Sequence, residues 1–67
     1  MAYDANMKPH RITLYQDEAG RWRWRRQAGN GRIVAASEQG LKRRKYAEKD
    51  AISELPAGVE YDLLILP

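Results

Sequence analysis

Cysteine and phenylalanine are absent from this sequence, and histidine occurs once in its 67 residues. Without cysteine the chain can form neither disulfides nor the thiolate metal sites that stabilise many small domains. A lone histidine also leaves no pair of imidazole ligands for a structural metal. The fold therefore depends on a hydrophobic core or on association with another chain, and we expect no metal and no cofactor.

Long hydrophobic runs are also absent. The longest run is residues 63–66, whereas a membrane-spanning helix needs about 20 apolar residues. Residues 1–5 lack the basic and then apolar pattern of a secretory signal peptide. We therefore expect a soluble, cytoplasmic protein without membrane contact.

A chain of 67 residues forms one small domain with a thin core. It buries only about 60% of its unfolded surface, so the hydrophobic gain is close to the entropy cost of ordering the chain. Because disulfides and metals are excluded, a partner subunit is the remaining way to bury more apolar surface. The sequence therefore predicts association with another chain.

Positive charge is concentrated in one region. The net charge is only +3, but five of the eight arginines lie between residues 21 and 32. Clustering of this kind indicates a surface that contacts acidic groups or phosphates.

Three segments alternate between apolar and polar residues, as half-buried strands do: residues 11–16, 21–28 and 32–37. Residues 1–10 show no period and are interpreted as a flexible leader. The remaining residues, 11–67, are predicted to form a single domain.

Asn30-Gly31 lies between the second and third segments and is typical of a β-hairpin with a two-residue turn. A type I′ turn requires positive φ at both central residues. The turn predicts Ala28 opposite Ile33 in a pair of antiparallel strands.

The first turn allows two registers. A four-residue loop would divide the apolar side chains between the two faces of the sheet. A three-residue loop that ends in a left-handed Gly20 sets Leu14 opposite Trp24 and collects the apolar side chains on one face, so we favour it. That face contains Ile12, Leu14, Trp22, Trp24, Ala28, Ile33 and Ala35.

After Gly40 the period becomes helical, and residues 42–55 are predicted to form a helix that covers the tryptophan face until Pro56 ends it. Residues 61–66 are predicted to form a strand that is buried on both faces. The fold class is therefore α+β, in the order β-β-β-α-β. It consists of a three-stranded antiparallel sheet, one helix and a C-terminal strand.

An alternating run of tryptophan and arginine, an Asn-Gly turn and two later small residues stand at a characteristic spacing. They are Gly20-Arg21-Trp22-Arg23-Trp24-Arg25, Ala28-Gly29-Asn30-Gly31 and Ile33-Val34-Ala35-Ala36-Ser37, followed by Gly40 and Ala47. Over residues 11–55 this pattern resembles the YegP-like family, a bacterial, archaeal and phage domain of unknown function. The chain departs from the family at Leu41 and Arg43, where an aromatic residue and a Ser or Thr helix cap commonly stand.

The resemblance implies an assembly of two copies, because YegP-like domains occur as tandem repeats or paired subunits that form one continuous sheet and exchange their last strands. For this single-copy chain it implies a strand-exchanged homodimer. Pairing of the last strand within its own chain is the alternative. The expected interface residues are Tyr61, Leu63, Leu64, Ile65 and Leu66.

Two basic groups are candidate sites for nucleic acid or another anion. The first lies on the sheet face away from the helix, where guanidinium groups beside an aromatic ring can bind phosphates and stack on bases. The second lies at the helix start, where cations oppose the helix dipole and an anion would offset them. For both groups the alternative, which we favour, is an ordinary solvated surface. The residues are Arg11, Arg21, Arg23, Arg25 and Tyr15 on the sheet, and Lys42, Arg43, Arg44 and Lys45 at the helix start.

Catalytic groups are not apparent. His10 has no neighbouring acid to orient it, and the two tryptophans are expected to be core residues. We expect a non-enzymatic binding or accessory protein that acts through protein contact, with no identified small-molecule substrate. The alternative function is a sequence-tolerant nucleic-acid binder that uses the two basic groups.

Overall fold

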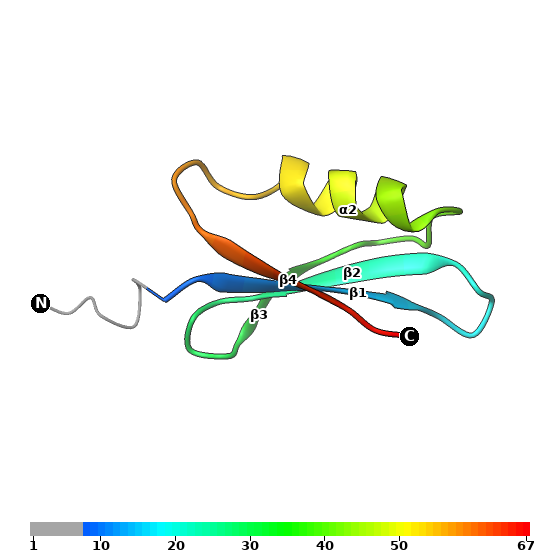
Figure 1. Ribbon diagram of the computed structural model, residues 1–67, viewed down its shortest axis with the longest axis horizontal. Coiled ribbons are helices and arrows are strands. Elements are labelled where there is room, and N and C mark those ends of the chain that lie inside the picture. The colour runs from blue at the N-terminus through cyan, green and yellow to red at the C-terminus, as the bar shows by residue number, and fades with distance from the viewer. Residues whose placement is uncertain (1–7) are drawn as a thin grey trace, which may run out of the picture.

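A computed structural model describes residues 8–67 of the chain as an α+β fold in which one helix covers one face of a four-stranded sheet (Figure 1). This confirms the predicted class and element order. Of the leader predicted for residues 1–10, residues 1–7 lie outside the described residues, and His10 is the first strand residue. The elements are β1 (His10–Gln16), β2 (Trp22–Gln27), β3 (Ile33–Ala36), α2 (Arg44–Ser53) and β4 (Tyr61–Ile65).

The sheet has four strands and is mixed, in contrast to the predicted three-stranded antiparallel sheet. Its order is β3-β2-β1-β4, and β4 pairs in parallel with β1 of the same chain. The reason is the path of the chain after α2. The turn at residues 54–60 returns it to the start of β1, where the His10 backbone N–H donates to the Glu60 carbonyl at 2.9 Å.

The first hairpin has the register that the apolar pattern predicts. Leu14 pairs with Trp24, and Gly20 has a φ of 80°. The backbone N–H of Gly20 donates to the carbonyl of Asp17, and that of Asp17 donates to the carbonyl of Arg21. A residue with a side chain is disfavoured at this positive φ, so glycine specifies the three-residue loop.

The second hairpin does not contain the predicted type I′ turn. Only Gly31 has a positive φ, of 89°, so Asn30 does not adopt the conformation that such a turn requires. The N–H of Gly31 donates to the Ala28 carbonyl, and the N–H of Ala28 donates to the Arg32 carbonyl. Both hairpins therefore use the same loop, and Ala28 lies opposite Arg32 instead of Ile33.

This change of loop alters the surface of β3. Ile33 pairs with Gln27, and the register shifts between Arg26 and Gln27, so that Arg26 pairs with Ala35. Ile33 was predicted to be part of the tryptophan face, but its side chain is 61% exposed. Val34 is also exposed. The apolar side chains of β3 are therefore largely outside the core.

The core lies between α2 and the two central strands. Helix α2 packs on β1 and β2, and its two buried residues, Ala47 and Ala51, are small enough for a close approach to the sheet. The helix begins at Arg44, two residues later than predicted, and ends at Ser53. The fully buried residues are Ile12, Leu14, Trp24, Ala47 and Ala51, and Trp22, Ala35, Leu41 and Leu55 pack against them.

Candidate functional site

The basic sheet face is partly neutralised by the protein itself. The Arg23 Nε atom donates to Asp17 Oδ2 at 2.7 Å, and the two side chains are 34% and 21% exposed. Asp17 Oδ1 also accepts the backbone N–H groups of Ala19 and Arg21. Asp17 therefore ties the first hairpin loop to strand β2, and the Nε atom of Arg23 is already used in this contact.

The same contacts change the acidity of Asp17. The hydrogen bond from Arg23 lowers the pKa of the Asp17 carboxyl below its ordinary value, and the Arg21 N–H adds to this effect. A lowered pKa means that the ionised form is favoured in the folded protein. The ion pair is thus part of the structure at neutral pH.

A second arginine of this face is held by an aromatic ring. The Arg25 guanidinium lies 5.1 Å from the centre of the Tyr15 ring, within the range of a cation–π contact. Thr13 of β1 lies on the same face of the sheet. It is only 2% exposed, although no helix of residues 8–67 covers this face. Its strand neighbours are Arg25 and Leu64, whose long side chains flank it on the same face.

Two arginines of the predicted sheet site remain exposed. Arg11 lies on β1 beside Asp62 of β4, and Arg21 lies just before β2. Arg21 is close to Gly40, where a Cβ atom would lie only 2.5 Å from the Arg21 Cβ atom. The structure therefore places Tyr15 and the four arginines on the predicted strands, but it occupies Arg23 and Arg25 with internal contacts.

The basic group at the helix start is more open. Lys42, Arg43, Arg44 and Lys45 are all exposed. Arg43 is the N-cap residue, its side chain makes no capping hydrogen bond, and the first turn contains no acidic residue. Within residues 8–67 no carboxylate lies within ion-pair distance of these four cations.

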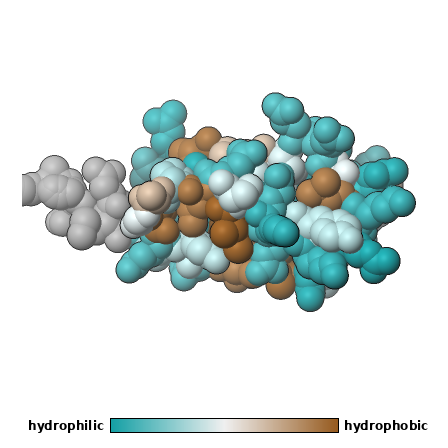
Figure 2. Space-filling view, turned by 90° about the horizontal axis from the view of Figure 1, so that it is seen from above, coloured by the Kyte–Doolittle hydropathy of each residue, from teal (hydrophilic) through white to brown (hydrophobic). Residues whose placement is uncertain are grey.

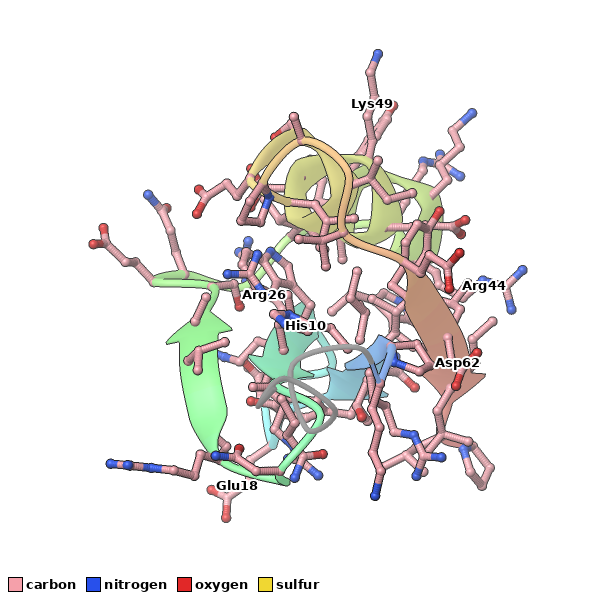
Figure 3. All side chains as sticks on the ribbon, turned by 90° about the vertical axis from the view of Figure 1, so that its left-hand side faces the viewer. His10, Glu18, Arg26, Arg44, Lys49 and Asp62 are labelled. Carbon is pink, nitrogen blue, oxygen red and sulfur yellow. The ribbon has the colours of Figure 1, made fainter. Side chains whose placement is uncertain are left out.

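The two basic groups do not form one surface. The helix start lies in the layer above the sheet (Figure 1), whereas strand alternation places Arg23 and Arg25 on the face opposite Trp24, which the helix leaves uncovered. Arg44 points outward on the side of β4 (Figure 3). A ligand would meet either group separately.

The predicted interface strand β4 is the least buried strand of the sheet. All five of its residues are exposed, and Leu63, Leu64 and Ile65 are 37% to 41% exposed. Leu66, just after the strand, is half-buried. The sequence predicted that β4 is buried on both faces, and in the single chain this is wrong. Helix α2 packs over β1 and β2, and no layer of residues 8–67 covers the opposite face.

A groove between α2 and the end of β3 was not predicted from the sequence. At its base the Trp24 indole Nε1 donates to Asp50 Oδ2 at 2.9 Å, and the Trp24 backbone N–H donates to Ser37 Oγ at 3.1 Å. One feature of the sequence could have indicated that Asp50 faces the sheet at this groove. Asp50 follows Ala47 by three residues, which places both on the sheet-facing side of the helix.

Arg26 is a buried cation that was not among the predicted site residues. It is 7% exposed and lies beneath α2 (Figure 3), where its Nη1 atom donates to the carbonyl of Glu54 at 3.1 Å. This carbonyl is at the C-terminal end of the helix, where the helix dipole favours a cation. Its Nε atom has no hydrogen-bond partner among the described residues.

Groups for catalysis or metal binding do not come together in residues 8–67. No group of three His, Asp or Glu side chains there could hold a metal ion. His10 begins β1, and its Nδ1 atom is buried without a partner from this part of the chain. In the same residues no helix is long and apolar enough to cross a membrane.

Comparison with protein-family models, with curated proteins and with solved structures gives no match to this chain. The fold and its surfaces are therefore the basis for a functional proposal.

Proposed function

We propose that the protein is a non-enzymatic, cytoplasmic binding or accessory protein that works as a homodimer through β4. The observation that carries the proposal is the exposure of this strand, in which every residue is open to solvent in the single chain. Three consecutive aliphatic residues in β4, from Leu63 to Ile65, give it apolar side chains on both faces.

The position of β4 in the sheet makes the exposure costly. Within residues 8–67 it is an edge strand with β1 as its neighbour, so one row of its backbone N–H and C=O groups is unpaired in this sheet. Natural proteins protect apolar edges because such strands pair with other chains. A second copy of the same strand region would cover the edge and the aliphatic side chains together.

Strand exchange is the form of dimer that we favour. The turn at residues 54–60 connects β4 to the domain, and Gly58 in it has a φ of 81°. If this turn opens, β4 can leave β1 of its own chain and pair with β1 of the second copy, and the two exchanged strands can then lie side by side in one continuous sheet, which covers both edges. The motif resemblance to YegP-like domains supports this form.

Sedimentation equilibrium at micromolar concentration tests the dimer. We expect a dimer for the natural sequence and a folded monomer for Leu64→Lys, since Leu64 is 41% exposed in the single chain. Ile33→Lys is the matched control, because Ile33 is an exposed aliphatic residue on the opposite edge strand, and this variant should remain a dimer. A natural protein that sediments as a cooperatively folded monomer contradicts the proposal.

Phosphate binding by the basic helix start is the second candidate function, acting on nucleic acid. Its support is the group Lys42–Lys45, whose four exposed cations have no ion-pair partner within residues 8–67. The sheet arginines give less support because Arg23 and Arg25 are engaged internally.

Fluorescence polarisation with mixed-sequence DNA and RNA tests this candidate. Binding through phosphates should weaken steeply as salt rises. Arg43→Ala with Arg44→Ala should weaken binding to all sequences, whereas Arg11→Ala with Arg32→Ala removes the same charge elsewhere and should have less effect. Absence of binding at 50 mM salt excludes this function.

A further inference from the structure

The groove between α2 and the segment that follows β3 is an open site of about 720 Å³. Ala36, Ser37 and Leu41 form part of one wall, and Tyr46 and Asp50 form part of the helix wall. Figure 2 views the molecule from the helix side and shows brown hydrophobic patches between teal side chains. The groove therefore combines apolar and polar surface beside a strand.

Strand β3 has a free edge next to this groove. It is the terminal strand of the sheet, with β2 as its only neighbour in the described residues. The register shift affects its first half, around Ile33 and Val34. The regular part, from Ala35 to Ser37, continues the pairing with β2, and Ala36 and Ser37 line the groove. An added strand would find its backbone partners there.

The groove is acidic, although the chain as a whole has a net charge of +3. Its lining contains the carboxylates of Glu38, Asp50 and Glu54 and one ammonium group, that of Lys49. Lys49 points away from the sheet (Figure 3). None of the three carboxylates forms an ion pair within residues 8–67.

We propose that this groove binds an extended basic segment of a partner protein, which adds as a strand beside β3. The proposal rests on the proposed role in protein contact but not on the homodimer, which uses the opposite edge of the sheet. Side chains of an extended segment alternate, so every second one would point toward α2. A lysine or arginine at such a position would meet Glu38 and Asp50, and an apolar side chain two residues along the segment, on the same face, would contact Leu41 and Tyr46.

The indole N–H of Trp24 is a built-in reporter for this binding. It donates to Asp50 Oδ2 in the wall of the groove. A cation that approaches the carboxylate will change the NMR shift of this N–H. The indole of Trp22, the other tryptophan, provides an internal reference because Trp22 does not line the groove.

The experiment is an NMR titration of the whole protein with two short capped peptides that alternate valine with lysine or valine with glutamate. We expect saturable shifts with the lysine peptide at the Trp24 indole and at the amides of residues 36–41. Glu38→Gln with Glu54→Gln should weaken binding by about fivefold, as loss of two exposed ion pairs does. Gln39→Ala is the control, because it changes the groove rim without changing its charge, and Leu64→Lys should leave peptide binding unchanged.

Three results would overturn the proposal. The first is equal binding of the two peptides, and the second is no saturable shift at millimolar peptide. The third is a shift of the groove amides on dilution of the protein alone, which would show that a second copy occupies the groove. Because the dimer is measured by sedimentation of Leu64→Lys, failure of the peptide titration leaves the homodimer proposal to its own test.

Discussion

The central strand β2 and the edge strand β4 differ in how well the single chain buries their apolar side chains. On β2 the Trp24 side chain is fully buried beneath α2 and its indole N–H is bonded to the helix residue Asp50. On β4, at the far edge, Leu63 faces the same side as Ile12 but remains 37% exposed. One helix of ten residues covers the central strands and leaves the edge strand open. The comparison shows that the single chain buries its core but leaves the apolar side chains of its edge strand β4 exposed.

Replacing one leucine by alanine in each of the two regions should give the largest difference in the free energy of unfolding. Leu14 is fully buried and Leu64 is 41% exposed. Leu14→Ala should reduce the free energy of unfolding by about 2 to 5 kcal/mol through lost burial and a cavity. Leu64→Ala should change the unfolding of the monomer by less than about 1 kcal/mol.

Urea unfolding at several protein concentrations measures both effects. The loss for Leu14→Ala should not depend on concentration, whereas Leu64→Ala should lower stability mainly where the natural protein is dimeric. Equal losses for the two variants at high dilution would show that β4 is as well packed as the core.

Gly40→Ala should have an intermediate effect. The added Cβ atom would lie 2.5 Å from the Arg21 Cβ atom and 3.1 Å from Asp17 Oδ2. The segment after β3 would have to move, at a cost of about 1 to 3 kcal/mol in thermal or urea unfolding. Gln39→Ala, at an exposed neighbouring residue, should change stability by no more than about 0.5 kcal/mol. A neutral Gly40→Ala would mean that this segment is not held against β2.

The smallest effect concerns the Asp17–Arg23 ion pair, which is at the surface. Its contact lowers the pKa of Asp17 in the folded protein below the ordinary value of 3.8. The carboxylate therefore adds stability above pH 3.8, and this contribution is lost as the pH falls through the lowered folded pKa. The stability difference between the natural protein and Asp17→Asn should shrink over this acidic range.

Urea midpoints measured from pH 7 down to pH 2 give this difference. A difference that does not change with pH would assign the role of Asp17 to neutral hydrogen bonding of the loop. Glu18→Gln is the control, because Glu18 lies in the same loop and makes no ion pair in residues 8–67.

Local residue chemistry explains which parts of the fold were predictable. Gly20 and the alternation around Leu14 and Trp24 specify the first register, because the other register divides the apolar side chains. For the second hairpin, the Asn30-Gly31 dipeptide predicts the wrong turn. The same dipeptide also suits a loop in which only the glycine is left-handed, and this loop moved Ile33 out of the core.

The candidate sites depended on contacts between distant segments and were harder to predict. The basic face was expected from Arg23 and Arg25, but the pairing of Arg23 with Asp17 requires the folded hairpin. The groove requires the position of α2 over the sheet. The parallel pairing of β4 with β1 follows from the path of the chain after the helix, for which the sequence contains no turn signal that specifies direction.

The most direct test of the proposed exchange of β4 between two copies is a disulfide between β1 and β4. The natural chain has no cysteine that could interfere. Arg11 and Asp62 are exposed partners on these strands, and Arg11→Cys with Asp62→Cys would join them. After oxidation of the folded protein, strand exchange predicts a covalent dimer on a non-reducing gel. A product that is entirely monomeric and internally cross-linked would contradict the exchange of β4.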